Sequence, residues 1–186
     1  MKKIAVDIDN ILWDFSPVFW EKLRQINPTI IPPTVWDKWG FWETYVTKKQ
    51  FYTAIKEIHL EQDRYLPFDG AQPFLASLKE RGFYIIIASH RVPETRTATE
   101  KWLLKNGLAY DELHLSNDKS IIFKDLCAVV DDSPSVLDRA RDAGIIRVGL
   151  RCPWNKETDH PLCESLEEIL TYLDRSCTTP GTRDDK

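Results

Sequence analysis

Acidic residues occur as two close pairs, each directly after a short apolar run. Asp7 and Asp9 follow the run IAV, and Asp131 and Asp132 follow the run AVV. Carboxylates held close together repel one another, which raises their pKa unless a cation lies among them. Hard divalent ions such as Mg²⁺ prefer oxygen ligands. If the fold brings the two pairs together, they predict a Mg²⁺ site.

A hydroxyl and an amine occur at comparable places in the chain. Ser89 ends the run FYIIIAS, and Lys119 lies shortly before the segment that carries Asp131 and Asp132. Each of these residues alone has an ordinary explanation as a turn residue, a helix cap or a surface lysine. Together, carboxylates, a hydroxyl and a lysine form a set suited to phosphoryl transfer, which depends on positioning and on neutralising oxygen charge. The conjunction of four segments therefore favours a functional site.

Strand and helix patterns alternate through most of the chain, which is typical of a parallel sheet covered by helices on both faces. We expect a Rossmann-like three-layer α/β/α core. Its ligands would bind outside the carboxyl ends of the strands, where the polar residues named above fall. The expected strands cover residues 3–9, 83–89, 112–115, 126–132 and 145–150, and the expected helices cover 71–81, 94–106, 134–143 and 167–173.

One segment interrupts this alternation. For about fifty residues after the first strand the sequence carries no strand pattern, which is too long for a plain connection. The segment contains helix starts at Ser16-Pro17 and at Thr47 with Gln50, and the aromatic run VWDKWGFWETY. We therefore predict a small helical cap at 17–67, a core formed by 1–16 and 68–176, and a disordered tail at 177–186.

Composition excludes several classes of function. The net charge is -4 with no basic cluster, which argues against binding of duplex nucleic acid. No apolar stretch is long enough to span a bilayer, and the N-terminus does not resemble a signal peptide, so a cytoplasmic location is the expectation. The cysteines show no metal-ligand spacing and are expected to be reduced. The oligomeric state stays open, a homodimer included.

The motifs resemble those of a known family. DIDNIL, the strand ending at Ser89, Lys119 and VVDDSP are similar to the four motifs of the haloacid dehalogenase superfamily, in the same order along nearly the whole chain. DIDNILWDF, NDKSIIFKDLCAVVDD and GFW resemble its 5'(3')-deoxyribonucleotidase branch. Two departures are Asn10, where the family has glycine, and His90-Arg91, where those nucleotidases have serine and proline.

The resemblance implies a Mg²⁺-dependent phosphomonoester hydrolase. Asp7 would attack phosphorus and form an aspartyl-phosphate, and Asp9 would act as general acid and then as general base. The ion would be held by the Asp7 carboxylate, the Asp9 carbonyl and Asp132. Asp131 would support this site or reach the ion through a water molecule.

The substrate implied by the resemblance is small and phosphorylated, in this branch a nucleoside monophosphate. Ser89 and the amide that follows it would bind phosphoryl oxygens, with His90 beside them, and Lys119 would neutralise charge and restrain Asp7. Large aromatic side chains of the predicted cap either form its interior or contact substrate. We assign Trp20 and Trp36 to the interior, and Phe15, Phe41 and Trp42 to the substrate.

Other functions are compatible with the same residues. The cap could select another small phosphorylated metabolite, since a fold does not determine a substrate. A phosphate-accepting receiver domain also uses clustered acids, a hydroxyl and a lysine, but it has no cap and places its lysine last, whereas Lys119 precedes the second acidic pair. A non-catalytic binding protein would not need both Asp7 and Asp9.

Overall fold

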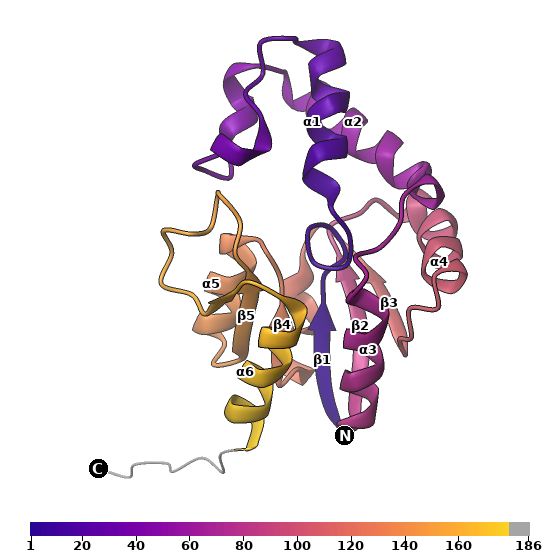
Figure 1. Ribbon diagram of the computed structural model, residues 1–186, viewed down its shortest axis with the longest axis vertical. Helices are drawn as coiled ribbons and strands as arrows, with labels where there is room; N and C mark the ends of the chain where they lie inside the picture. Colours follow the sequence, from indigo (N-terminus) through magenta and orange to yellow (C-terminus); the bar gives the residue numbers. More distant parts are fainter. Residues whose placement is uncertain (179–186) are drawn as a thin grey trace.

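The computed structural model describes residues 1–178. They form a six-stranded parallel sheet in the order β3-β2-β1-β4-β5-β6, with helices on both sides (Figure 1). The predicted α/β class is therefore confirmed. The strands are β1 (Lys2–Val6), β2 (Phe83–Ser89), β3 (Glu112–Leu115), β4 (Ala128–Val130), β5 (Ile146–Leu150) and β6 (Leu162–Cys163).

Helices complete the three layers. The α-helices are α1 (Phe15–Ile26), α2 (Lys48–Leu60), α3 (Ala71–Glu80), α4 (Arg96–Lys105), α5 (Pro134–Asp142) and α6 (Leu166–Thr178). The 3₁₀ helices are η1 (Pro33–Val35), η2 (Phe41–Thr44), η3 (Gln62–Arg64), η4 (Pro93–Thr95) and η5 (Lys119–Asp125). Helix α6 continues two residues into the segment predicted to be a disordered tail, and the rest of that tail, 179–186, lies outside the described residues.

Alternation along the central strands produces two separate apolar layers. Ile4 and Val6 of β1 join one buried cluster with residues of α3 and α6, whereas Ala5 joins a second cluster with residues of η5 and α5. Successive side chains of a strand point to opposite faces, so residues 5 and 7 share a face. Asp7 consequently continues the Ala5 side of the sheet, on which η5 and α5 lie.

Three strands are shorter than the sequence predicts, β5 by a single residue, and a sixth strand is present that the sequence does not predict. β1 ends at Val6 rather than at residue 9, because the chain turns directly after Asp7: Leu12 N–H bonds Ile8 O at 2.8 Å, and Asn10 has φ 58°. β4 spans only three residues of the expected 126–132. The two-residue β6 has no apolar run that could have indicated it.

The segment between β1 and α3 is helical, as its sequence predicts. It places α1 and α2 beyond the carboxyl ends of the strands, at the top of Figure 1. Helix α2 begins with a complete capping box, in which Thr47 Oγ1 accepts from Gln50 N–H and the Gln50 side chain accepts from Thr47 N–H. These helices therefore lie over the edge of the sheet where the acidic residues are located. The division of the chain into core and cap stays a prediction.

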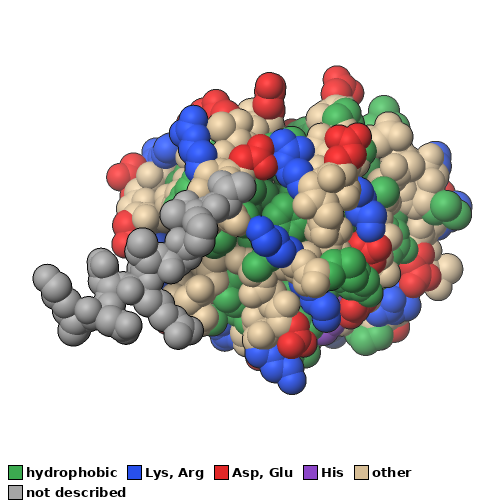
Figure 2. Space-filling view, turned by 90° about the horizontal axis from the view of Figure 1, so that it is seen from below, with side chains coloured by type: hydrophobic (Ala, Val, Ile, Leu, Met, Phe, Trp, Pro, Cys, Tyr) green, Lys and Arg blue, Asp and Glu red, His purple; other side chains and the backbone are tan. Residues whose placement is uncertain are grey.

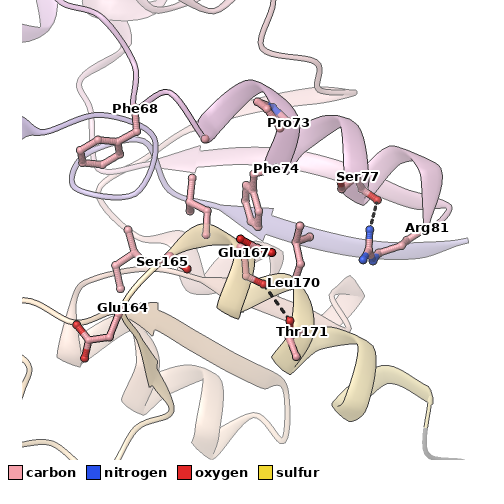
Figure 3. Close-up of a pocket in the computed structure, with 13 residues that line it drawn as sticks. Phe68, Pro73, Phe74, Ser77, Arg81, Glu164, Ser165, Glu167, Leu170 and Thr171 are labelled. Carbon is pink, nitrogen blue, oxygen red and sulfur yellow. Dashed lines mark hydrogen bonds between the residues drawn. The ribbon is translucent and has the colours of Figure 1, made fainter.

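Two other surfaces of the molecule lie away from the edge of the sheet that carries the acidic residues. Figure 2 shows the opposite end, where acidic and basic side chains are interspersed. A groove between α3 and α6 is lined by side chains that include Phe74, Leu170 and Arg81, and none of the predicted site residues lines it (Figure 3). Among the described residues, no helix combines the length and apolar character that a membrane span requires.

Candidate active site

The carboxyl ends of β1, β2 and β4 meet at one point because these three strands are adjacent and parallel. Asp7 follows β1, and its N–H donates to Val130 O, the end of β4, at 2.9 Å. Ser89 is the last residue of β2 and is completely buried. Asp131 and Asp132 follow β4 and are also buried. The topology thus assembles residues that lie more than one hundred positions apart in the chain.

Lys119 lies between two of these carboxylates. Its Nζ is 2.9 Å from Asp7 Oδ1 and 2.7 Å from Asp131 Oδ2, and the residue is only 3% exposed. Burial alone would lower the pKa of Lys119, but the charges of Asp131 and Asp7 outweigh it and raise that pKa above its ordinary value. Lys119 is therefore a fixed positive charge beside Asp7. It is held there by η5, whose first turn is capped by the Asp118 side chain accepting from Ser120 N–H.

Asp7, Asp131 and Asp132 each offer a carboxylate oxygen, and these oxygens lie within 4.8 Å of one another. Desolvation and the neighbouring Asp131 raise the pKa of Asp7 to about 6, against the opposing effect of Lys119. Desolvation and the charges of Asp131 and Asp7 likewise raise the pKa of Asp132 well above its ordinary value. One lysine therefore does not neutralise the cluster. An all-oxygen donor set with this excess of negative charge fits Mg²⁺.

Asp131 and Asp132 have different partners. Asp131 Oδ2 accepts from Lys119, and its Oδ1 accepts from Ser133 N–H at 2.9 Å. Asp132 Oδ2 accepts from Asn10 Nδ2 at 3.0 Å. Both oxygens of Asp131 are thus engaged by protein donors, so Asp132 is the better placed of the two to bind a cation.

Asn10 occupies the position where the resembled family has glycine. Its φ of 58° is in the left-handed region, which asparagine tolerates better than most residues. Its Oδ1 accepts from the N–H and the hydroxyl of Ser16 at 3.1 and 2.7 Å. The departure from glycine therefore keeps the turn, and it adds a link from Asp132 to the start of α1.

Asp9 is held by Trp13 of its own motif and by two side chains outside that motif, Arg91 and His59. Its Oδ1 accepts from Arg91 Nη2 at 2.7 Å and from Trp13 Nε1 at 2.8 Å, and its Oδ2 lies 3.0 Å from His59 Nε2. Burial would raise the pKa of Asp9, but the Arg91 guanidinium and His59 outweigh burial and hold that pKa well below its usual range. Asp9 is consequently a carboxylate in this arrangement.

His90 follows Ser89 at the edge of the site, where one part of its side chain is open to solvent and another faces the protein. It lines a small polar cavity together with Lys119 and Arg139. Partial burial and the charge of Lys119 lower the pKa of His90 to about 4, so its ring is neutral at pH 7. A neutral ring at this place offers one donor and one acceptor to a ligand.

An aromatic cavity of about 90 Å³ lies next to Asn10, between α1, α2 and the loop after β5. Phe15 and Phe41, which are predicted to contact substrate, line this cavity, and so does Trp36, whose ring stacks on Phe41 at 3.8 Å. Trp42 is not among the lining residues and instead stacks on Phe51 at 4.1 Å. The structure thus brings Phe15 and Phe41 together beside the acidic site and directs Trp42 elsewhere.

Sequence reasoning missed several residues of this region. His59 contacts Asp9 although it lies fifty positions away in the sequence, in a helix with an ordinary amphipathic pattern. Trp154 also lines the aromatic cavity, and its Nε1 is buried without a hydrogen-bond partner among the described residues. In the sequence, Arg91 is recognisable only as a departure from the nucleotidase motif. In the sequence, the charge and size of Arg91 are the one signal for a role at the site, because an arginine that the fold buries requires a partner.

Comparison with solved structures identifies the fold. CbbY from Rhodobacter sphaeroides, solved in complex with phosphate, superposes with TM-score 0.63 and 14% identity over 94% of this chain and 99% of that chain. D,D-heptose 1.7-bisphosphate phosphatase from B. bronchiseptica, solved with magnesium and phosphate, superposes with TM-score 0.55 and 14% identity over 94% and 99%. A HAD-superfamily hydrolase from Ehrlichia chaffeensis superposes with TM-score 0.57 and 17% identity over 95% of this chain and 99% of that chain. The chain has the fold of the haloacid dehalogenase superfamily hydrolases, as its motifs predict.

A relative found by sequence comparison carries a name more specific than the fold. A protein of Chlorobaculum tepidum named "Putative 5'(3')-deoxyribonucleotidase" is 22% identical over 187 aligned positions, which cover 91% of this chain and 89% of the relative. No family model matches the sequence. The relative's name agrees with the branch that the motifs around Asp7 and Lys119 resemble.

Proposed function

We propose that this protein is a Mg²⁺-dependent phosphomonoester hydrolase that works through an aspartyl-phosphate and acts on nucleoside monophosphates. The observation that carries the proposal is the position of Asp7, buried at the end of β1 between Lys119 and the carboxylates of Asp131 and Asp132. A carboxylate placed against a lysine and a cation site can approach a phosphate dianion, because both positive charges offset the repulsion.

Asp7 is the nucleophile in this proposal. Its Oδ1 accepts from Ile8 N–H at 2.7 Å and from Lys119, which leaves Oδ2 for attack on phosphorus. A bond forms between Oδ2 and phosphorus while the ester oxygen–phosphorus bond breaks and the alkoxide leaves with the electron pair. Water then attacks the same phosphorus, the Asp7 oxygen–phosphorus bond breaks, and inorganic phosphate is released.

Asp9 is the general acid and base. Arg91 and His59 keep Asp9 ionised, which is the state a general base needs before it accepts a proton from the attacking water. The same pairing opposes protonation, so accepting that proton and donating one to the leaving alkoxide both require the carboxyl group to separate from the guanidinium. Leaving groups that need no proton therefore react with less dependence on Asp9.

The phosphoryl oxygens are bound by the Ser89 hydroxyl and the amide that follows it, with Lys119 and His90 nearby. Mg²⁺ would be held by the carboxylates of Asp7 and Asp132 and by the Asp9 carbonyl, and when bound it supplies charge neutralisation to the phosphoryl group. Asp131 supports the site by holding Lys119.

The aromatic rings of this cavity support a ligand that carries a planar ring, such as a nucleobase. Phe15, Phe41 and Trp36 present ring surface beside the acidic site, and aromatic faces stack on planar rings. The name of the Chlorobaculum relative agrees with this assignment. A phosphatase for another small phosphorylated metabolite would use the same Asp7 chemistry but would not need this cavity.

A phosphate-release screen tests the proposal. It measures hydrolysis of nucleoside monophosphates, sugar phosphates and an aryl phosphate, each with Mg²⁺ and with EDTA. We expect metal-dependent turnover that is highest for a nucleoside monophosphate and lost in Asp7→Asn. Absence of turnover with every substrate would refute the enzymatic function, and preference for a sugar phosphate would refute the nucleotide assignment alone.

A further inference from the structure

Arg91 contributes a buried guanidinium to the site although no motif includes it. The residue is 1% exposed and each of its nitrogens has a partner. Nε donates to Ser89 Oγ at 3.2 Å, and Nη2 donates to Asp9 Oδ1 at 2.7 Å. Nη1 donates to Thr99 Oγ1 at 2.9 Å and to Gln62 Oε1. One planar group therefore contacts both the hydroxyl and the acid that the proposed reaction uses.

Thr99 and Gln62 anchor Nη1 and so fix the orientation of the guanidinium. Thr99 lies in α4 and is held in turn by its own hydroxyl donating to Thr95 O at 3.0 Å. Gln62 lies in η3, at the end of the helical segment above the sheet, and is completely buried. Because the guanidinium is rigid and planar, fixing Nη1 also fixes the directions in which Nε and Nη2 donate.

The contact with Ser89 has a direct chemical consequence. A serine hydroxyl has one proton to donate and lone pairs that accept. When a lone pair of Ser89 Oγ accepts from Arg91 Nε, the proton of that hydroxyl is directed away from Arg91 and stays available for a phosphoryl oxygen. Asp9 is fixed by the same group, so its carboxylate keeps a constant position relative to Ser89.

We infer that Arg91 is a positioning residue for phosphoryl transfer, which aims the Ser89 hydroxyl at the phosphate and holds the Asp9 carboxylate where it takes a proton from water. This inference rests on the proposed function and assigns a role to the position where the chain departs from the nucleotidase pattern. Lysine cannot replace it, because an ammonium group cannot reach Ser89, Asp9, Thr99 and Gln62 in one plane.

Arg91→Gln and Arg91→Lys test the inference, with Arg96→Gln as the matched control. Arg96 is a half-exposed arginine at the start of α4 whose partners are Glu100 and Leu113 O, away from the site. The first measurement is binding of inorganic phosphate in the presence of Mg²⁺ by calorimetry. Without Arg91 the Ser89 hydroxyl is no longer directed at the phosphate. Phosphate binding is therefore expected to weaken about tenfold in both Arg91 variants, with no change in Arg96→Gln.

The second measurement is the pre-steady-state burst with p-nitrophenyl phosphate. Its leaving group needs no proton, so formation of the aspartyl-phosphate does not depend on Asp9, whereas attack by water does. The Arg91 variants are therefore expected to release a burst of p-nitrophenol that approaches the enzyme concentration, followed by slow turnover. An alkyl phosphate is expected to give no burst, since both of its steps depend on Asp9.

A structural role alone would give a different result. If the Arg91 variants fold, bind phosphate as the unmodified protein does and lose turnover without a burst, the inference is wrong. If they do not fold, Thr99→Val carries the test, because it removes one anchor and leaves Arg91 in place; unchanged phosphate affinity and kinetics in that variant would overturn the inference. Failure of the unmodified protein to hydrolyse any phosphomonoester would instead refute the proposed function.

Discussion

Asn10 Nδ2 donates a hydrogen bond to Asp132 Oδ2 at 3.0 Å and so joins the turn after β1 to the end of β4. The backbone of Asn10 is left-handed, with φ 58°. Asn10→Gly keeps that conformation accessible and loses the side-chain bonds, whereas Asn10→Ala loses the bonds and is also forced into an unfavourable region. We expect Asn10→Ala to be the less stable variant by about 1 kcal/mol.

Urea unfolding of the two variants measures this difference in the free energy of unfolding. The comparison between them is informative because both lose the contacts with Asp132 and Ser16. Equal free energies of unfolding for the two variants would contradict a left-handed backbone at position 10. The presence of asparagine in place of glycine would then have no conformational explanation.

Lys119→Met is predicted to destabilise the metal-free protein strongly at pH 8. The substitution leaves Asp7 and Asp131 buried without their shared cation, and breaking a buried ion pair on one side costs about 3–5 kcal/mol. Lys124→Met is the matched control, since Lys124 is an exposed lysine of the same 3₁₀ helix. Chemical denaturation measures both variants, and similar losses in the two would contradict the central position of Lys119.

Stability should also depend on pH through Asp7. Its pKa rises from 3.8 in the unfolded chain to about 6 in the fold, so the folded state binds more protons between these values. A raised carboxyl pKa means that stability falls as pH rises from about 4 to about 6, by roughly 3 kcal/mol for this group. Above pH 6 the full loss is present. Asp7→Asn should flatten the curve of unfolding free energy against pH.

Mg²⁺ is predicted to reverse this loss. The ion binds the ionised carboxylates of Asp7 and Asp132, so it stabilises the protein more at pH 7.5 than at pH 5. Thermal unfolding with Mg²⁺ and with EDTA at both pH values measures the effect. A shift in Tm that is equal at the two pH values, or that persists in Asp7→Asn with Asp132→Asn, would place the ion elsewhere.

Phe41→Ala should separate nucleotide substrates from small ones. Phe41 lines the aromatic cavity, and its removal takes ring surface from a base without affecting Asp7. We expect KM to rise about fivefold or more for a nucleoside monophosphate, from the loss of about 1–3 kcal/mol of stacking, and to change little for p-nitrophenyl phosphate. Trp42→Ala is the control, because Trp42 does not itself line the cavity and contacts it only through its stacking partner Phe51. Equal effects of the two variants would refute the cavity as the base site.

The positions of the acidic residues could be predicted because strand ends are readable in the sequence. Asp7, Ser89 and Asp131 each follow an apolar run, and parallel strands bring their carboxyl ends to one edge. The length of β1 could not be predicted in the same way. The alternating pattern of IAVDID continues past Val6, but the chain turns after Asp7, with Leu12 N–H bonded to Ile8 O and Asn10 in the left-handed region.

Contacts between distant segments were beyond prediction for a physical reason. His59 belongs to a helix whose spacing indicates burial but not a partner, and its contact with Asp9 depends on how α2 lies over the sheet. Phe41 and Trp42 are neighbours with the same chemistry, and only the geometry of η2 separates them. Side-chain type and spacing thus indicate the reaction, whereas tertiary packing selects the residues around it.

Chemical trapping of the phosphorylated residue tests the central claim most directly. The protein is mixed with substrate and Mg²⁺, quenched with acid, reduced with borohydride and mapped by peptide mass spectrometry, since borohydride converts an aspartyl-phosphate to homoserine. We predict homoserine at position 7, in the peptide that contains Asp7 and Asp9, and none after mixing without substrate. Turnover with no modification at Asp7, or with modification at another residue, would contradict the proposed mechanism.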